Sequence, residues 1–346
     1  MNVLVTGGTG FVGSHLIEQL LTTGVNVRAL VRPGSNAAMV RSLGARVVTG
    51  DLNDAEALGA ACRDCDVVYH AAARVEIVGS QKDFDRVTVG GTENLLRAGR
   101  AEGVDRFVYI SSCGIYHPKL LATGKEIDET TTSPEPPRWF VYGRAKYRAE
   151  NLVREFDTGK MEWVIVRLGY LYGPRNQTMQ RYLERLFLRM RFRAFIGDGS
   201  NEMAMLYVED AARAITLAGS CPDAAGKILI AGGNERVTQK QYFDALADGF
   251  GVSRIKGTIP YWFAFLCGWL GEYAAYGEAR GLFCRSAVAL TGLPQKLQCR
   301  FTQDLLGWRP KVCFDDGIRR AFDWYWAEYG EKQVENAGNP RQSHSQ

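Results

Sequence analysis

The chain opens on the stretch Met1-Asn2-Val3-Leu4-Val5-Thr6-Gly7-Gly8-Thr9-Gly10-Phe11-Val12-Gly13, in which an apolar run leads directly into glycines spaced Gly-x-x-Gly-x-x-Gly. A helical pattern then continues to Thr23. Glycine allows a tight turn and a close approach to phosphate, and the free N–H groups at a helix start favour negative charge. The stretch therefore predicts a strand–turn–helix that binds a dinucleotide pyrophosphate, against the alternative of a glycine turn that only packs a helix.

Short runs rich in valine, isoleucine and aromatic residues alternate with helical patterns through the first half of the chain. We expect strands at Val3–Thr6, Asn26–Val31, Arg46–Val48, Val67–His70, Phe107–Ser111 and Trp163–Arg167. We expect helices at 11–23, 36–43, 55–62, 84–101 and 142–156. Repeated β-α-β units with nearly continuous apolar strands predict an α/β fold: a Rossmann-type, doubly wound parallel sheet whose ligand lies beyond the carboxyl ends of the strands.

The pattern changes after about Gly169, and a length of 346 residues fits two lobes. We place the dinucleotide-binding domain at 1–170, with segments near 206–219 and 227–231 returning to it. Residues 171–330 form a smaller, mostly helical C-terminal substrate lobe, with helices expected at 180–193 and 239–250. The polar segment 331–346 is expected to be a disordered tail.

The composition is that of a folded globular protein, with 46% hydrophobic and 23% charged residues. A net charge of +4 is too small to indicate a nucleic-acid partner. Because the opening residues already form the binding strand, we expect no signal peptide, a cytoplasmic location and eight reduced cysteines. Cys62 and Cys65 have the spacing of half a zinc site but no second Cys/His pair nearby, so we expect no metal.

The segment Tyr142-Gly143-Arg144-Ala145-Lys146 places a phenol and an ammonium four residues apart, on one face of a helix. A nearby ammonium stabilises tyrosinate and should lower the pKa of Tyr142 toward neutral. Such a phenol suits general acid/base work on a carbonyl–alcohol pair. Ser111 and Ser112, at the end of a central strand, can hydrogen-bond a substrate oxygen. The structural alternatives are an exposed helix pair and a turn-capping serine.

Taken together, these motifs resemble the extended short-chain dehydrogenase/reductase family over almost the whole chain, from Val3 to about Tyr329. The matching pieces are Thr6-Gly7-x-x-Gly10-x-x-Gly13, Gly50-Asp51-Leu52, His70-Ala71-Ala72-Ala73, Gly91-Thr92-Glu93-Asn94-Leu95-Leu96, Ser111-Ser112, Tyr142-x-x-x-Lys146, Tyr172-Gly173-Pro174-Arg175, Gly197-Asp198-Gly199, Val208-Glu209-Asp210 and Leu306-Gly307-Trp308-Arg309-Pro310. The C-terminal half most resembles the 3β-hydroxysteroid dehydrogenase-like and dihydroflavonol reductase-like branch.

The resemblance implies a role for each part of the site. Tyr142 would exchange a proton with the substrate, Lys146 would tune Tyr142 and hold the nicotinamide ribose, and Ser112, in preference to Ser111, would polarise the substrate oxygen. The implied cofactor-binding residues are Gly7, Thr9, Gly10, Phe11, Val12, Gly13, Arg32, Asp51, Leu52, Ala71, Ala73, Tyr142 and Lys146. Thr88 departs from the family, which often has Asn there, so a proton relay through that Asn would need a hydroxyl or water. The resemblance also implies a homodimer through helices 84–101 and 142–156.

The second strand ends at Val31-Arg32 and lacks the acid that NAD-selective sites place there to bind the ribose hydroxyls. A guanidinium suits the 2′-phosphate of NADP, and Ser35 could add a hydrogen bond. We therefore favour NADP(H) over NAD(H), which stays open. A solvated arginine beside the adenine is the structural alternative.

Two positions argue against sugar-nucleotide chemistry. The dehydratases of the family share an Asp-Glu pair after the catalytic hydroxyl, where this chain has Cys113 and Gly114. Sugar-nucleotide enzymes commonly place Arg before the Val-x-Asp motif, and here Met203 occupies that slot. A thioether does not bind a diphosphate. Arg175 or Arg181 could substitute, so the exclusion is partial.

The run from Ile259 to Leu270 is too apolar for a plain surface helix and, at 12 residues, too short to span a bilayer. It is a core helix of the second lobe, an apolar lid over a lipid-like substrate, or a surface that dips into a membrane. The segment from Arg185 to Arg193 interleaves basic and apolar residues, as peripheral membrane contacts at an inner membrane face do and solvated helix faces also do.

The function we infer from the sequence is an NAD(P)-dependent oxidoreductase that moves hydride between nicotinamide and a hydrophobic secondary alcohol or ketone of sterol, lipid or flavonoid type. A sugar-nucleotide epimerase that holds its NAD is the first alternative. A cofactor-sensing or scaffold protein without turnover is the second.

Overall fold

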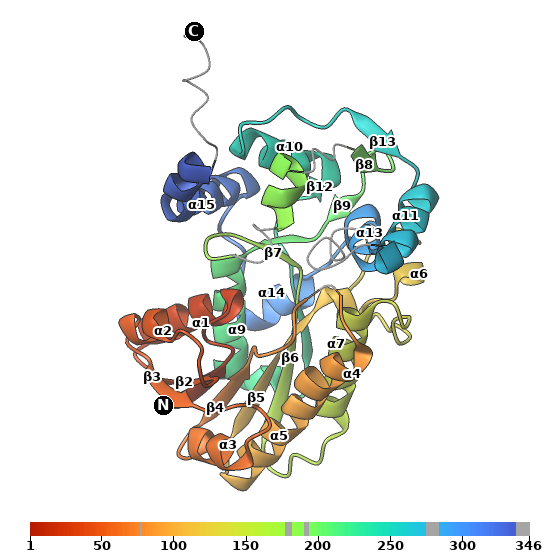
Figure 1. Cartoon of the computed structure of the whole chain (residues 1–346). Helices are drawn as coiled ribbons and strands as arrows, with labels where there is room; N and C mark the ends of the chain where they lie inside the picture. Colours follow the sequence, from red (N-terminus) through yellow and green to blue (C-terminus); the bar gives the residue numbers. More distant parts are fainter. Residues whose placement is uncertain (77, 177–181, 190–193, 275–283, 337–346) are drawn as a thin grey trace.

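A seven-stranded parallel sheet organises the first lobe (Figure 1), and the computed structural model describes residues 1–76, 78–176, 182–189, 194–274 and 284–336. The strands, in spatial order, are β11 (Ile228–Ala231), β6 (Glu162–Leu168), β5 (Arg106–Ser112), β4 (Val67–His70), β1 (Asn2–Thr6), β2 (Asn26–Val31) and β3 (Arg46–Thr49). All neighbouring pairs are parallel. The order reverses between β1 and β4, which is the Rossmann switch point where ligands bind. The expected fold class is confirmed.

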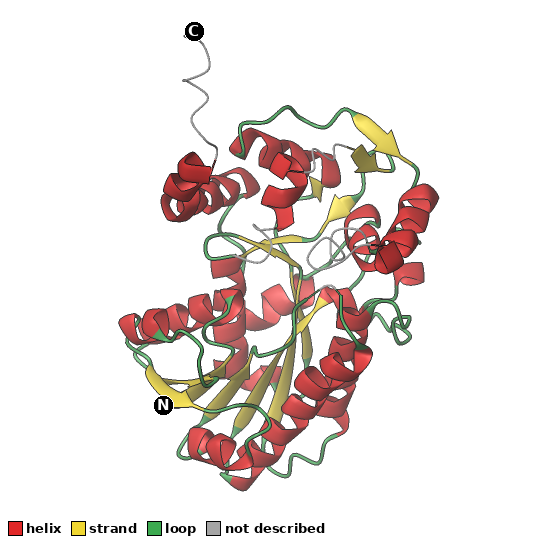
Figure 2. Ribbon diagram, viewed as in Figure 1, coloured by secondary structure: helices red, strands yellow, loops and turns green. Residues whose placement is uncertain are grey.

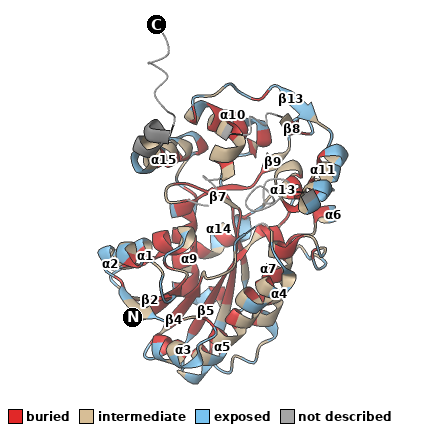
Figure 3. Ribbon diagram, in the orientation of Figure 1, coloured by how far each residue is buried: buried red, intermediate tan, exposed pale blue. Residues whose placement is uncertain are grey.

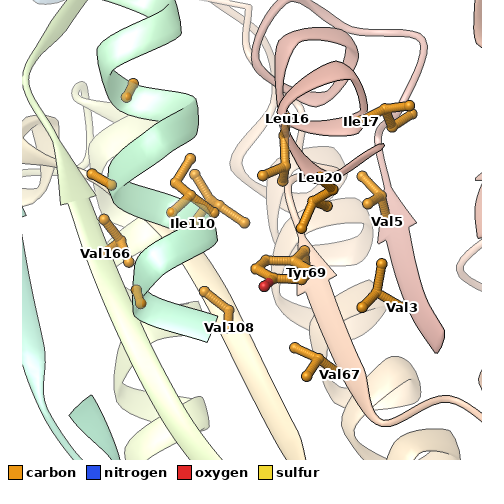
Figure 4. Packing of buried hydrophobic residues seen from close by; sticks show 14 of the residues in the cluster. Val3, Val5, Leu16, Ile17, Leu20, Val67, Tyr69, Val108, Ile110 and Val166 are labelled. Carbon is orange, nitrogen blue, oxygen red and sulfur yellow. The ribbon is translucent and has the colours of Figure 1, made fainter. Parts of the chain in front are cut away.

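Helices cover both faces of this sheet, which is why its strands are apolar on both sides (Figure 2). On one face lie α1 (Phe11–Thr22) and α9 (Val208–Ser220), and on the other lie α3 (Ala55–Cys62), α5 (Gly91–Ala101) and α7 (Val141–Glu155). Figure 4 shows the first of these cores, where Leu16 and Leu20 of α1 point toward Val3, Val5 and Tyr69 of the sheet.

The helix expected at 84–101 is interrupted. It consists of α4 (Gln81–Phe84), a π-helical segment η1 (Asp85–Gly90) and α5. Two adjacent glycines, Gly90 and Gly91, give the segment low helix propensity, and the Thr92 hydroxyl donates to the Thr88 carbonyl at 2.5 Å. The other expected helices of the first half are present, with α2 (Ala38–Ser42) shorter than predicted.

The second lobe is built mainly from α10 (Gln239–Gly249), α11 (Tyr261–Ala274), α13 (Arg285–Gly292) and α15 (Phe314–Asn336). Three small sheets join them: β7 (Tyr170–Tyr172) with β10 (Met205–Tyr207), β9 (Glu202–Met203) with β12 (Val237–Thr238), and β8 (Ala194–Ile196) with β13 (Gly257–Ile259). Short helical segments also occur along the whole chain: η2 (Cys113–Ile115) and α6 (Pro118–Leu121) after β5, η3 (Arg185–Arg189) in the second lobe, and η4 (Pro222–Ala224) after α9.

Two features depart from the predicted lobe boundaries. α14 (Arg300–Leu306) and the following Trp308 pack against β11 and α9, so this late segment belongs to the core of the first lobe. α15 extends to Asn336, into the segment expected to be a tail, and no Gly or Pro interrupts residues 331–336. Residues 337–346 lie outside the described residues, as do 177–181 and 190–193 of the helix expected at 180–193.

Candidate active site

A cavity of about 1170 Å³ lies between the two lobes, beyond the carboxyl ends of β1, β4 and β5. All the residues predicted for catalysis and cofactor binding line it: Gly7, Thr9, Gly10, Phe11, Val12, Gly13, Arg32, Asp51, Leu52, Ala71, Ala73, Ser112, Tyr142 and Lys146. The fold thus gathers segments that are separated by more than a hundred residues in the chain.

The glycine turn after β1, called the cradle below, is a tightly packed backbone loop in which side chains on Gly7 or Gly13 would clash with neighbouring backbone atoms. Gly7 has a left-handed φ of 73°, and a Cβ on it would lie 2.7 Å from the Ala72 nitrogen. A Cβ on Gly13 would lie 2.2 Å from the Gly7 carbonyl oxygen. α1 begins after Gly10 without a side-chain cap and without an acid in its first turn. Its N-terminal N–H groups therefore suit a phosphate, and the residues present fit a dinucleotide.

Arg32 lies on the cavity wall at the end of β2, is exposed, and forms no ion pair with another described residue. Asp51 and Leu52 follow β3 on the same wall. The Asp51 carboxylate accepts hydrogen bonds from the Asn53 backbone and side chain, which holds its loop. Ser35, the additional residue proposed for a 2′-phosphate, does not line the cavity in the described structure.

Tyr142 reaches the end of β5 because two glycines let α7 come close to it. A Cβ on Gly143 would lie 2.2 Å from the Gly114 carbonyl oxygen, and one on Gly114 would lie 3.5 Å from the Tyr142 ring. The resulting contact lets Tyr142 share a hydrogen bond with Ser112. Gly143 was not among the predicted site residues, because its role depends on a backbone approach that spacing does not reveal.

The expected lowering of the Tyr142 pKa is wrong for this structure. Desolvation raises the pKa of Tyr142, and the hydrogen bond with Ser112 offsets this only in part. The Lys146 ammonium is not aimed at the phenol. Its Nζ donates to the Ile110 carbonyl oxygen at 2.6 Å and lies 4.7 Å from the Tyr109 ring centroid.

Lys146 itself is 3% exposed, and burial lowers its pKa to about 7, against the opposing effect of Glu150 one turn along α7. Its charge state therefore changes near neutral pH. A strongly shifted ammonium on the wall of a cleft is a mark of functional sites.

The two strand-end serines differ in their partners. Ser111 donates to the Glu150 carboxylate at 2.8 Å and belongs to a buried network. Ser112 accepts from the Gly114 N–H at 3.0 Å and so caps η2, the structural role that was its alternative. Ser112 also hydrogen-bonds with Tyr142, which leaves it, rather than Ser111, next to the phenol.

A buried ion pair beneath the site escaped the sequence analysis. The Arg167 guanidinium donates to both oxygens of Glu150 and to the Tyr116 hydroxyl. Glu150 and Arg167 are 2% and 6% exposed, so each depends on the other for its buried charge. The network fixes α7 against β5 and β6. Its only sequence signal was the placement of Glu150 one turn after Lys146.

His70 forms a second buried link, between the end of β1 and the start of α5. Thr92 gives its hydroxyl hydrogen to the Thr88 carbonyl, so it accepts from His70 Nε2 at 2.9 Å. Thr6 then donates to His70 Nδ1 at 2.7 Å. Burial and nearby Lys146 lower the pKa of His70 to about 3, so the ring is neutral. The Thr88 hydroxyl accepts from the Arg74 N–H at 3.3 Å, outside the cavity wall.

The wall from the second lobe has a different chemistry. It consists mainly of apolar side chains, among them Leu183, Leu186, Ile196, Phe243, Ile259, Phe263, Ala264, Val288 and Leu290. Within the described ranges, no Lys, Arg, Asp or Glu from residue 168 onward lines the cavity. Met203 is buried in the core of the second lobe.

The arginines that could have replaced a diphosphate-binding residue at Met203 do not do so where they are described. Arg175, with a left-handed φ of 68°, turns away to contact His15 and to pair with Glu18 at 2.5 Å. Arg181 lies outside the described residues.

Cys62 and Cys65 lie away from the cavity wall. Both are buried free thiols at the turn between α3 and β4, and burial raises the pKa of Cys62 to about 12. In the described part of the chain, no group of three or more His, Cys, Asp or Glu residues is arranged to hold a metal ion.

Comparisons with known proteins agree with this geometry. The family model described as "NAD dependent epimerase/dehydratase family" matches residues 3–232. A 4-hydroxy-2-methyl-3-oxo-4-farnesyl-3,4-dihydroquinoline-1-oxide ketoreductase from Stigmatella aurantiaca is 29% identical over 92% of this chain and 95% of its own. A 3 beta-hydroxysteroid dehydrogenase/Delta 5→4-isomerase from Mycobacterium tuberculosis is 29% identical over 93% and 90%. The solved structure of gox2253 superposes with a TM-score of 0.77 at 27% identity, over 95% of this chain and 98% of its own.

Proposed function

This chain belongs to the NAD dependent epimerase/dehydratase family, which confirms its resemblance to the extended short-chain dehydrogenase/reductases, and on that premise we propose that it interconverts an apolar secondary alcohol and its ketone. The observation that carries the proposal is that the second-lobe wall of the cavity, over the residues that the structure describes, carries no charged side chain. Burying a charged substrate against that wall would leave its charge unpaired, whereas an apolar one gains from burial.

The nicotinamide supplies or accepts the hydride when it is bound. Tyr142 exchanges the proton at the substrate oxygen, and Ser112 orients that oxygen through the hydrogen bond it shares with the phenol. Lys146, whose Nζ donates to the Ile110 carbonyl, would hold the nicotinamide ribose, as the family resemblance implies. Gly7, Gly10 and Gly13 hold the pyrophosphate.

The names of the two curated relatives support this substrate class. One is a ketoreductase of a farnesyl-bearing compound, and the other is a hydroxysteroid dehydrogenase. We place the substrate of this chain in the same broad class of sterol-, lipid- or flavonoid-like molecules.

We further propose that the preferred cofactor is NADP(H) within this NAD-dependent family. Arg32, exposed at the end of β2 and on the cavity wall, supports it, since a guanidinium there suits a 2′-phosphate. The family resemblance also supports a homodimer through α5 and α7, which static light scattering would test.

The decisive experiment follows NADPH absorbance with purified protein and a panel of apolar ketones. Stoichiometric oxidation of NADPH by at least one ketone supports the proposal. A sugar-nucleotide epimerase would instead hold NAD through purification and convert a UDP-sugar without net change in absorbance. Absence of turnover with both substrate sets, despite cofactor binding, would favour a sensing or scaffold role and overturn the proposed activity.

A further inference from the structure

α11 carries six exposed large apolar side chains, and Figure 3 colours much of this helix as exposed. Five of them, Trp262, Leu266, Trp269, Leu270 and Tyr273, share the outer face of the helix by their spacing, and Phe263 lies at the edge of that face beside the cavity. Trp262 is 67% and Tyr273 72% exposed. The other large exposed hydrophobics in the described chain, such as Phe301 and Trp326, lie singly on different elements. A contiguous apolar patch of this kind marks an interaction surface.

The opposite side of the same helix closes the cavity. Phe263, Ala264, Cys267 and Gly268 line it, and Ala264 is 3% exposed. A Cβ on Gly268 would lie 2.9 Å from the Cys284 backbone, so α11 packs closely against α13 at this point. α11 is thus neither the fully buried core helix nor the plain surface helix considered from the sequence. At this point the cavity wall is a single helix, α11, with the exterior on its other side.

We propose that this outer face, the α11 stripe of Trp262, Leu266, Trp269, Leu270 and Tyr273, docks on an anionic lipid bilayer. Tryptophan and tyrosine favour the membrane–water interface, and an apolar helix face can lie a few ångströms into it. None of the helices in the described residues meets the length and hydropathy needed to span a membrane, so the contact is peripheral.

The charges around the stripe suit a negative surface. Glu272 is the only charged residue of α11, and Arg285 binds both of its oxygens, at 3.0 and 2.6 Å. Two exposed cations flank the helix: Lys256 precedes β13, and Arg138 precedes Trp139, whose ring lies 5.3 Å from that of Phe265. Neither cation forms an ion pair within the described part of the chain. Such cations near an apolar stripe are attracted to acidic phospholipids.

A second copy of the chain is a poorer occupant. α11 has 14 residues and is about 21 Å long. The area of one face of such a helix is small compared with the roughly 800 Å² that each partner buries in a stable interface. A bilayer, in contrast, would bring apolar molecules to the helix that walls the cavity. This delivery role rests on the apolar substrate proposed above, whereas the docking itself does not.

Vesicle flotation tests the docking without any measurement of turnover. The protein should float with phosphatidylcholine vesicles that contain phosphatidylglycerol, and less with phosphatidylcholine alone. The triple variant Trp262→Gln/Trp269→Gln/Leu270→Gln should lose about tenfold or more of this binding, because three apolar anchors are removed. Phe301→Gln, an exposed apolar residue elsewhere, is the matched control and should float as the wild type does.

A separate double variant tests the contribution of the two flanking cations, Arg138 and Lys256. Arg138→Gln/Lys256→Gln should remove much of the gain that phosphatidylglycerol provides and leave binding to phosphatidylcholine unchanged, and added salt should have the same effect. The thermal unfolding temperature and NADPH affinity of each variant report whether it is folded, since none of these side chains lines the cavity.

Three outcomes would overturn the proposal: wild-type protein that stays in the unfloated fraction with both vesicles, a triple variant that floats normally, or a wild-type dimer that the triple variant abolishes in light scattering. If flotation follows the stripe but no ketone is reduced, docking stands and the proposed activity fails.

Discussion

The two walls of the cavity differ in kind. The first-lobe wall follows from strand ends and carries the glycine cradle with charged residues such as Arg32, Asp51 and Lys146. The second-lobe wall, as far as it is described, carries none. We infer that cofactor and proton chemistry are set on the sheet, whereas the class of substrate is set by helices that pack over it. Substitutions on the two walls should therefore affect different kinetic quantities.

The largest effect is expected on the first-lobe wall at the phenol. Tyr142→Phe removes the proton that the substrate oxygen must gain or lose, so kcat should fall about 10²- to 10⁴-fold. The Kd for NADPH, measured by fluorescence titration, should change by no more than about twofold because the ring remains. Tyr147→Phe, the next tyrosine on α7 and outside the cavity wall, is the control. Normal turnover in Tyr142→Phe would refute the assignment of the acid/base.

The cradle should be nearly as sensitive, and in a graded way. A methyl group at Gly13 would meet the Gly7 carbonyl oxygen at 2.2 Å, and backbone cannot move aside cheaply. Gly13→Ala should cost about 3 kcal/mol of stability or a comparable loss of NADPH affinity. At Gly8 the nearest atom is the flexible Ile17 Cδ1, at 2.7 Å, so Gly8→Ala should cost less. If Gly8→Ala and Gly13→Ala lost the same stability in urea unfolding and the same affinity in NADPH titration, this description of the turn would be contradicted.

A polar change on the second-lobe wall should affect the substrate alone. Leu290 lines the cavity and is half-buried, so Leu290→Gln can remain folded. The KM for an apolar ketone should rise about tenfold, since an amide replaces apolar contact, while the Kd for NADPH stays constant. A change in NADPH affinity without a change in KM would mean that the two walls do not divide the work as inferred.

The reverse pattern is expected at Arg32. Arg32→Gln should weaken NADPH binding about tenfold and leave NADH binding unchanged, because only NADPH offers a 2′-phosphate to the guanidinium. The KM for the ketone should not move. Equal effects on both cofactors in parallel titrations would show that Arg32 does not discriminate between them.

The smallest expected effect is the loss of folding stability caused by burying the Lys146 ammonium on the first-lobe wall. The folded pKa of Lys146 is about 7, below its unfolded value, so the folded state releases this proton first and wild-type stability rises with pH above about 7. Lys146→Met removes this dependence. Relative to Lys146→Met, the wild type should gain about 1 kcal/mol in free energy of unfolding from pH 6 to pH 8. Urea titrations at the two pH values measure it, and a constant difference would exclude the shifted pKa.

Local patterns were sufficient for much of the first lobe. Strand ends, the glycine turn and the four-residue separation of Tyr142 and Lys146 are periodic or steric features of short segments, and the predicted residues all reach one cavity. The π-helical turn at Thr88 was missed, since it depends on a hydroxyl–carbonyl bond that competes with regular α-helix.

What the sequence by itself determined is which groups are available and on which turn of chain each one lies, because strand and helix periods are short-range. Tertiary structure alone decided how those groups behave. The pKa of Tyr142 rises instead of falling because burial outweighs the hydrogen bond with Ser112, while Lys146 bonds to the Ile110 carbonyl. Likewise, α11 acquires one face on the cavity and one on the exterior through its packing against α13. Desolvation and helix contacts depend on distant segments, and no local pattern encodes them.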